Sequence, residues 1–464
     1  MQDVLDTAVL DAPPAKAAPA QTITERMLEE FSFVGRWKRK EFKDGLLWDS
    51  WLTLRPDGTW AQNGTIQVAT KPQNFRRDGT WTREEETLVC AIGKSTLPDS
   101  SGSFTIDIAA LIGDSESLVG LPDFSWRQEM VTLAYIAYAG TLGEKGGQPT
   151  VLLELINRFL EELEPVNGKW DVVWGPGLVN AGFTNLVDTN VFYVVRDRRD
   201  PTRYVIAIRG TNPLSIYSIL NQVSAVNEQE LWPVEDLPRR KWPRVSEGVA
   251  NTLKHLKRVR AQKGVPGAGL TLVDFLKQEV AACQSPLAIH TTGHSLGGTM
   301  SATVAMWLRE LQGSEGSLST RWDPKARCTI HSTPIAGFSP GDKRFAQHFD
   351  SAIGGTCDRL YNSLDVVPHT YAAEDMNYAK SIYEPMIDAG FAFKAAIDMM
   401  ELQFTLSNIN YRQVRDDTSA LEGTLEPSQK EFMAQMLWQH IEGYLKILGL
   451  SDFINAEEIL TASD

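Results

Sequence analysis

Short apolar segments that alternate with helix-like segments are the feature that most constrains the fold of this chain. Between residues 169 and 363, the apolar runs typical of strands are KWDVVW, NVFYVV, RYVIAIRG, LAIHTTG, CTIHSTP and DRLYNS. Helical spacing of apolar residues lies between several of them, at residues 248–261, 272–283, 296–311 and 342–349. This alternation predicts an α/β fold with a mostly parallel sheet that helices cover on both faces. Ligands of such sheets bind beyond the carboxyl ends of the strands.

Residues 31–114 have a different pattern, in which strands and tight turns dominate. The tetrapeptide DGTW occurs at residues 57–60 and again at residues 78–81. Asp-Gly between β-forming residues favours a hairpin, because Gly tolerates the positive φ of the turn. Two such hairpins, with the runs VGRWKRKEF and SFTIDIAAL, predict a small antiparallel β-barrel or half-barrel similar to a lipocalin-type module. Residues 1–30, rich in Ala and Pro, predict a disordered tail, and residues 120–464 are expected to form the α/β domain.

Charge and composition argue against several functions. A net charge of −14 argues against duplex nucleic-acid binding and against a general attraction to anionic membranes, although a local patch could still provide one. No apolar run of about 18 residues exists, so no transmembrane segment is expected. The first residues lack the pattern of a secretion signal, so a cytoplasmic location is the default expectation and unusual export stays open. No cofactor or metal constellation is found, and the oligomeric state cannot be read from the sequence.

One serine stands where the strand LAIHTT changes into an apolar helix, within TGHSLGG at residues 292–298. A nucleophile elbow needs a strand, a sharp turn with the serine at its apex, and a helix. Gly293 and Gly297 give the tight turn the small residues that it requires, and His294 completes the elbow. A phosphate-binding loop would need a lysine after the glycines, and the sequence has none there. The segment therefore predicts Ser295 as a nucleophile.

A nucleophilic serine needs an acid and a histidine, which follow it in the order Ser, Asp or Glu, His in this type of fold. The best acid is Asp365, within DRLYNSLDVVPHTY. Only His369 and His440 lie beyond it. His369 is in the same turn as the acid, where reaching both partners would be awkward. His440, in MLWQHIEGYLKIL near the end of the chain, is therefore the expected base, with His369 as the alternative.

Two further elements are expected around the serine. The N–H of Leu296 and the residue Thr211, which follows the strand RYVIAIRG, could together form an oxyanion hole. Residues 212–233 carry apolar side chains at helical spacing, namely Ile216, Ile219, Leu220 and Val223. A lid that opens towards lipid would have this pattern, and so would a buried packing helix.

The motifs AIRGT, TGHSLGG, STPIAGFSPGDKRFAQHF, NSLDVVPH and H..GY occur in this order along the chain. In these motifs the sequence resembles the class 3, fungal-type triacylglycerol lipases of the α/β-hydrolase fold, over roughly residues 125 to 450. The resemblance implies a triad of Ser295, Asp365 and His440, and an oxyanion hole of Thr211 and Leu296. Two departures stand out: about 60 residues separate the acid motif from the MLWQH segment, and the N-terminal β module is not part of the usual family core.

The sequence as a whole predicts a serine ester hydrolase that acts on acylglycerols at an oil–water or membrane interface, through an acyl-enzyme intermediate. A phospholipase A1 or a broad carboxylesterase is the nearest alternative. A catalytically inactive binding or scaffold protein, with the β module as its working part, is the alternative from another class.

Overall fold

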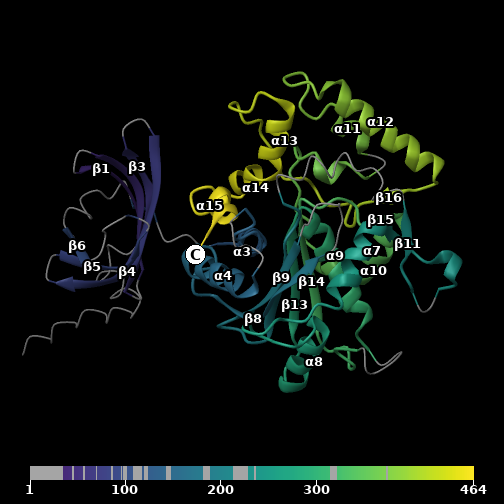
Figure 1. Ribbon diagram of the computed structural model, residues 1–464, viewed down its shortest axis with the longest axis horizontal. Helices are drawn as coiled ribbons and strands as arrows, with labels where there is room; N and C mark the ends of the chain where they lie inside the picture. The colour runs from purple at the N-terminus through teal and green to yellow at the C-terminus, as the bar shows by residue number, and fades with distance from the viewer. Residues whose placement is uncertain are drawn as a thin grey trace, which may run out of the picture. The chain divides into compact units, whose positions relative to one another are not determined.

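The computed structural model describes residues 35–43, 46–55, 58–68, 71–84, 87–95, 97, 102–107, 118–119, 124–142, 148–180, 189–212, 228–234, 237–313, 321–372 and 375–463. The chain divides into two compact units, Met1–Asp123 and Phe124–Asp464 (Figure 1). The tail expected over residues 1–30 lies outside the described residues. Most of the expected lid does too, since the description stops at residue 212 and resumes at residue 228 with a short strand.

The first unit is an antiparallel sheet with the strand order β6-β5-β4-β3-β2-β1-β7. Its strands are β1 (Gly35–Lys43), β2 (Leu46–Leu54), β3 (Thr59–Val68), β4 (Lys71–Glu84), β5 (Thr87–Ser95), β6 (Gly102–Asp107) and β7 (Leu118–Val119). The prediction of an antiparallel β module is confirmed. Its core is one apolar cluster of Trp37, Leu52, Leu54, Trp60, Trp81, Leu88, Cys90 and Ile106.

The two DGTW tetrapeptides have different structures. In the first, Gly58 lies between β2 and β3 with a φ of 82°, and Thr59 and Trp60 begin β3. The second lies inside β4 at a bulge between Asp78 and Gly79, so the hairpin predicted there is wrong. A Cβ atom on Gly79 would lie 1.8 Å from the carbonyl oxygen of Ala91. Glycine is needed at this second position for the close approach of β5 and not for a turn.

The second unit contains a five-stranded sheet with the order β14-β13-β10-β9-β8. Its strands are β8 (Trp170–Asn180), β9 (Thr189–Asp197), β10 (Arg203–Ile208), β13 (Ala288–His294) and β14 (Thr329–Ile335). β10, β13 and β14 are parallel, whereas β8, β9 and β10 pair antiparallel, so a mostly parallel sheet was predicted wrongly for that half. The link from β9 to β10 is too short for the crossover that parallel strands require. The predicted strand DRLYNS forms only isolated parallel bridges, such as Ile335 with Leu360.

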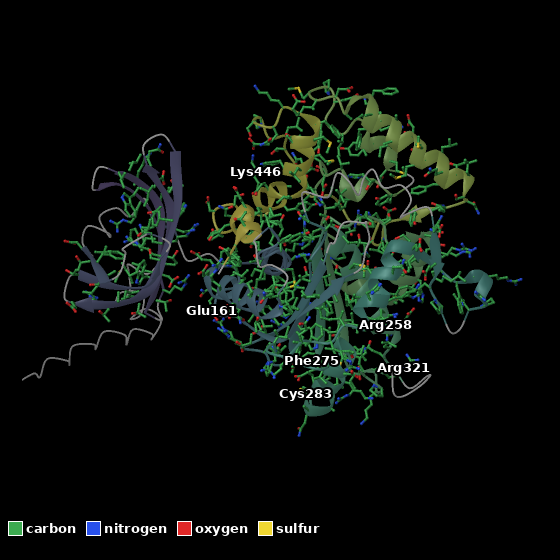
Figure 2. The ribbon with its side chains drawn as sticks, in the orientation of Figure 1. Glu161, Arg258, Phe275, Cys283, Arg321 and Lys446 are labelled. Carbon is green, nitrogen blue, oxygen red and sulfur yellow. The ribbon has the colours of Figure 1, made fainter. Side chains whose placement is uncertain are left out.

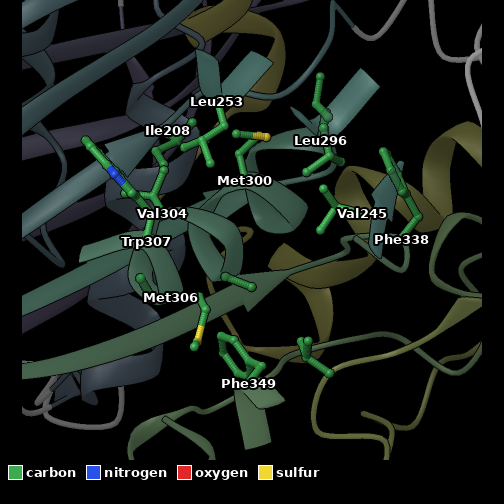
Figure 3. Packing of buried hydrophobic residues seen from close by; sticks show 14 of the residues in the cluster. Ile208, Val245, Leu253, Leu296, Met300, Val304, Met306, Trp307, Phe338 and Phe349 are labelled. Atoms are coloured by element: carbon green, nitrogen blue, oxygen red, sulfur yellow. The ribbon is translucent and has the colours of Figure 1, made fainter. Parts of the chain in front are cut away.

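Helices cover both faces of this sheet, as predicted (Figure 1). Helices α3 (Trp126–Ile136) and α4 (Pro149–Glu162) pack on one face, and α7 (Glu247–Leu256) and α9 (Leu296–Glu310) pack on the other. Successive residues of β10 point to opposite faces of the sheet. Val205 belongs to the apolar core formed with α3 and α4, and Ile206 belongs to the second core, formed with α7 and α9. Figure 3 shows the second core, in which Met300 of α9 lies near Leu253 of α7.

The remaining elements lie around this core. They are the strands β11 (Gln229–Leu231), β12 (Arg244–Ser246), β15 (Gly341–Asp342) and β16 (Tyr411–Arg412), which form a small sheet, the helices α8 (Leu272–Ala282), α10 (Lys343–Ala352), α11 (Met376–Ala379), α12 (Gly390–Leu406), α13 (Phe432–His440), α14 (Glu442–Ile447) and α15 (Ala456–Thr461), and the 3-10 turns η3 (Arg239–Lys241), η4 (Gly354–Thr356) and η5 (Val367–His369). No described helix has the length and apolar character needed to cross a bilayer. The long segment between the acid motif and MLWQH contains α11, α12 and β16.

Candidate active site

Ser295 lies at a sharp turn between strand β13 and helix α9, as the elbow motif predicts. Its backbone has a φ of 62° and a ψ of −129°, a conformation that non-glycine residues rarely adopt. The turn is held by its N–H, which donates to the carbonyl oxygen of Ile335 on β14 at 3.0 Å. Such strain costs roughly 1–3 kcal/mol and persists only where the surrounding structure enforces it.

The glycines around Ser295 let the backbone segments approach closely. A Cβ atom on Gly293 would lie 2.3 Å from the carbonyl oxygen of Gly297, and one on Gly297 would lie 2.2 Å from that of Ile208. Both contacts are too short for any side chain. The two residues predicted to shape the elbow are therefore fixed by contact with each other and with the neighbouring strand β10.

The end of β10 brings a second segment against the serine. In the parallel pairing of β10 with β13, Ile208 is opposite Gly293, so residues 209–211 continue beside the elbow. A Cβ atom on Gly210 would lie 3.0 Å from Cβ of Ser295. Thr211 follows and is 3% exposed. Leu296 begins helix α9, so its N–H has no acceptor inside the helix.

The structure joins Asp365 to His440 and not to His369. Nδ1 of His440 lies 2.8 Å from Oδ2 of Asp365, and both side chains are completely buried. His369 instead has Nδ1 3.5 Å from Oδ2 of Asp375 and lies between the rings of Tyr361 and Tyr378. Of the two histidines left open by the sequence, only His440 has the geometry of a partner of this carboxylate.

Two further donors hold the Asp365 carboxylate. Oδ1 accepts from the N–H of Val367 at 3.0 Å, and Oδ2 accepts from the hydroxyl of Tyr444 at 2.8 Å. Burial, and then the neighbouring Asp365 carboxylate, raise the pKa of Tyr444 well above its usual value, so its hydroxyl keeps the proton that it donates. The carboxylate is thus fixed to accept from His440.

The other ring nitrogen of His440, Nε2, is buried and has no hydrogen-bond partner among the described residues. A histidine that donates through Nδ1 to a carboxylate carries its lone pair on Nε2. That lone pair is available to accept a proton from a neighbouring group.

His294 connects the elbow to the segment of His440. Nε2 of His294 lies 2.6 Å from the carbonyl oxygen of His440, and the two rings have centroids 4.6 Å apart. Since a carbonyl only accepts, Nε2 of His294 carries the proton. Nδ1 is then an acceptor, 3.1 Å from the hydroxyl of Tyr138, which also donates to the carbonyl oxygen of His294 at 3.1 Å. Burial, followed by the proximity of His440, lowers the pKa of His294 far below its usual value, so this ring is neutral.

Several residues of this arrangement were not found from the sequence. Tyr138 lies against His294, and Gly210 leaves the space that the two occupy: a Cβ atom there would lie 2.3 Å from the Tyr138 hydroxyl and 2.3 Å from the His294 carbonyl oxygen. Tyr444 was visible only as part of the H..GY motif. The available signals were the glycine that ends the run RYVIAIRG and a tyrosine four residues beyond the histidine. Within the described part of the chain, no group of three or more His, Cys, Asp or Glu side chains could hold a metal ion.

Comparisons with known proteins find similarity to lipases. Residues 205–374 match the family model described as lipase (class 3). Among solved structures, M37 lipase is 29% identical and superposes with a TM-score of 0.66, over 73% of this chain and 96% of that chain. A triacylglycerol lipase from Penicillium expansum is 12% identical with a TM-score of 0.36, over 66% of this chain and 88% of that chain, too low a score to support further comparison. A search of curated proteins finds no match.

Proposed function

We propose that this chain, in which residues 205–374 match the class 3 lipase family, is an α/β-hydrolase that hydrolyses the carboxylic esters of acylglycerols with Ser295 as its nucleophile. The observation that carries the proposal is the buried Asp365–His440 pair. Nε2 of His440 has no hydrogen-bond partner among the described residues, and the backbone carbonyl of His440 is hydrogen-bonded to His294 in the elbow. A structural ion pair would have no need of an unpartnered ring nitrogen in a segment that is hydrogen-bonded to the residue before a strained serine.

In the first half-reaction, Oγ of Ser295 attacks the ester carbonyl while Nε2 of His440 takes its proton. The charge that develops on the carbonyl oxygen is stabilised by the N–H of Leu296 and by Thr211. Asp365, held by Val367 and Tyr444, keeps the imidazole in the tautomer that accepts at Nε2 and stabilises its protonated form. The tetrahedral intermediate then collapses, and protonated His440 gives its proton to the departing alcohol.

The acyl-enzyme is released in the second half-reaction. Water replaces the alcohol, and Nε2 of His440 takes a proton from the water as its oxygen attacks the acyl carbonyl. The second tetrahedral intermediate uses the same oxyanion donors. Its collapse returns the proton to Oγ of Ser295 and releases a fatty acid. No cofactor is required for either step.

Hydrolysis of p-nitrophenyl esters of increasing acyl length tests the proposed substrate class, with Ser295→Ala as the matched inactive variant. A lipase is expected to hydrolyse long acyl chains and to work faster once the substrate forms an emulsion. Rates that collapse beyond short acyl chains, with no increase at the emulsion interface, would identify a carboxylesterase instead. Release of fatty acid from phospholipids but not from acylglycerols would identify a phospholipase A1. No hydrolysis of any ester would leave the scaffold alternative.

A further inference from the structure

Helix α12 carries a row of large apolar side chains on its outer surface. Phe391 is 89% exposed, Met399 57%, Leu402 57% and Leu406 77%. At 3.6 residues per turn these four positions lie within an arc of roughly 80° on one side of the helix. We call them the α12 stripe. Among the described residues, these four account for a large share of the exposed large hydrophobic side chains, together with Met386 just before the helix, which is 75% exposed.

The α12 stripe is not the side of the helix that packs on the protein core. The opposite side of the same helix is already buried, through Ile397, Met400 and Phe404. Phe393 packs against Phe432 of α13, with ring centroids 4.7 Å apart. A surface helix of a globular protein normally has a polar outer face. An apolar outer face such as the α12 stripe marks a contact with something outside the unit.

A cationic groove begins where the α12 stripe ends. Residues 407–410 directly follow Leu406 and line a hollow of about 730 Å³. The basic side chains that line the same hollow are Arg240, Arg244, Lys343 and Arg344. We call it the basic groove. Figure 1 shows α12 at the outer edge of its unit, running down towards β15 and β16.

The described residues around the basic groove neutralise only part of its charge. None of its four basic side chains forms an ion pair with a described residue. Its single acidic lining residue, Asp342, is the N-cap of α10, where Oδ1 accepts from the N–H of Phe345 at 2.8 Å, and it offsets one of the four positive charges. Lys241, on the next hollow of about 470 Å³, adds a further cation. Basic side chains that gather without a described ion-pair partner are unusual on a chain whose net charge is −14.

The charges beside the α12 stripe itself are paired. Lys394 contacts Glu384 at 2.7 Å and Asp388 at 2.8 Å, and Lys380 contacts Asp398 at 2.6 Å. The helix therefore offers an apolar surface with local ion pairs at its side, and the free positive charge lies at its end.

We propose that the α12 stripe and the basic groove together form a docking surface for an anionic phospholipid bilayer. Apolar side chains of a surface helix enter the acyl boundary of a bilayer, and neighbouring cations contact its anionic headgroups. A neutral oil surface would leave the cations of the groove without a partner. A soluble polyanion would leave the apolar stripe exposed to water. Only a surface that is both apolar and negatively charged matches both parts.

The docking surface is built on the segments that carry the proposed acid and base. The hydroxyl of Tyr383 donates to the carbonyl oxygen of Leu364 at 2.9 Å, next to Asp365. Phe432, which contacts Phe393, begins the helix that ends at His440. Docking would therefore place the lipid surface against segments that contact those of the proposed acid and base. This deepens the proposed function and rests on it, but vesicle binding can be measured without catalysis.

Flotation of the full chain with vesicles tests the docking. One set of vesicles contains phosphatidylcholine alone, and the other also contains about 30% phosphatidylglycerol, whose negative charge attracts basic side chains. The wild type is expected to bind the anionic vesicles at least about tenfold more tightly than the neutral ones, and less tightly in high salt. Phe391→Ser with Leu402→Ser, and separately Arg240→Glu with Lys343→Glu, should each weaken binding by about tenfold or more. All four positions are on the surface, and circular dichroism checks that the variants fold.

Arg258→Glu is the matched control for Arg240→Glu alone, because it reverses one charge at an exposed site that forms no ion pair with a described residue and lies beyond the far end of α7 from Arg244. Figure 2 labels Arg258 on the part of the unit away from α12. This control should bind anionic vesicles within about twofold of the wild type.

Three results would overturn the docking proposal. Equal binding to neutral and anionic vesicles, or no binding to either, would remove the role of the charges. Binding that depends on the groove but not on the stripe would indicate a soluble-anion site. A dimer that Phe391→Ser dissociates in sedimentation would assign the stripe to a second copy of the chain. A fluorophosphonate label separates the two proposals: a chain that labels but does not bind vesicles contradicts docking alone, and one that binds but does not label contradicts the proposed function alone.

Discussion

His294, the residue before the proposed nucleophile, hydrogen-bonds through Nε2 to the backbone carbonyl oxygen of His440, the proposed base, over 2.6 Å. The two residues are far apart in the chain, and one contact joins the elbow to the helix end that carries the base. Because the contact uses the backbone of His440, the imidazole stays free for Asp365 on one side and for a proton on the other. The contact holds the end of α13 beside the elbow, although a long segment separates α13 from Asp365 in the chain.

Replacement of His440 by alanine should abolish almost all ester hydrolysis. Removing the base of a Ser-His-Asp unit costs on the order of 10⁴- to 10⁶-fold in kcat. His369→Ala is the control, because that residue contacts Asp375 and not Asp365, and it should retain activity within several fold. Steady-state kinetics on a soluble ester would measure both. If the His369 variant were the inactive one, the acid–base assignment would be wrong.

Replacement of Ser295 by glycine should make the protein more stable. The serine has a φ of 62° and a ψ of −129°, a region open to glycine and strained for other residues. Relief of that strain is expected to raise the free energy of unfolding by about 1 kcal/mol or more. Ser295→Ala, which removes the hydroxyl but keeps the Cβ atom, should show no such gain. Urea denaturation of the two inactive variants gives the comparison, and equal stabilities would argue that the elbow is relaxed.

Replacement of Tyr444 by phenylalanine should weaken both stability and catalysis. Its hydroxyl donates to Oδ2 of Asp365 at 2.8 Å inside a fully buried site. Loss of a hydrogen bond to a charged group costs about 1.5–3 kcal/mol of unfolding free energy. Because the carboxylate would also be held less firmly, kcat should fall while KM changes little. A variant with normal kcat would mean that Val367 alone is sufficient to position Asp365.

Protonation of His290 should make stability fall below about pH 6.5. Burial, and then the nearby His331, lower the pKa of His290 to about 3 in the folded chain. The unfolded chain has the ordinary value near 6.5, so between these values it binds more protons, and folding loses about 1.4 kcal/mol per pH unit for this group. His290→Gln should therefore show a shallower decline of unfolding free energy between pH 6 and pH 4 than the wild type. Parallel pH profiles would mean that His290 is not desolvated as described.

The parts of the site that follow from local chemistry could be predicted from the sequence. The strand–turn–helix around Ser295 is encoded in consecutive residues, and the order of acid and histidine along the chain left only two histidines to consider. The choice between His369 and His440 depended on which ring reaches Asp365, a contact across the fold that no local pattern contains. In the structure, it is the ring of His440 that lies 2.8 Å from the Asp365 carboxylate.

Other features depended on neighbours that the sequence does not reveal. Gly210 is required by the tyrosine and the backbone that fill the space beside it, and Tyr138 is recognisable only from its contact with His294. The two DGTW tetrapeptides have the same sequence, but Gly79 in the second is required because the backbone of β5 lies too close for a side chain. β9 and β10 are antiparallel because the connection between them is too short for a crossover. The apolar pattern of the strands does not distinguish a parallel from an antiparallel pair.

Active-site labelling tests the central claim most directly. A fluorophosphonate reacts covalently with a serine only where a base activates it, so the label reports Ser295 and His440 together. We expect the wild type to be labelled, Ser295→Ala to remain unlabelled, and a peptide containing residues 292–298 to carry the modification. A wild-type chain that is folded but unlabelled, or a Ser295→Ala variant labelled as well as the wild type, would contradict the assignment of Ser295 as the nucleophile.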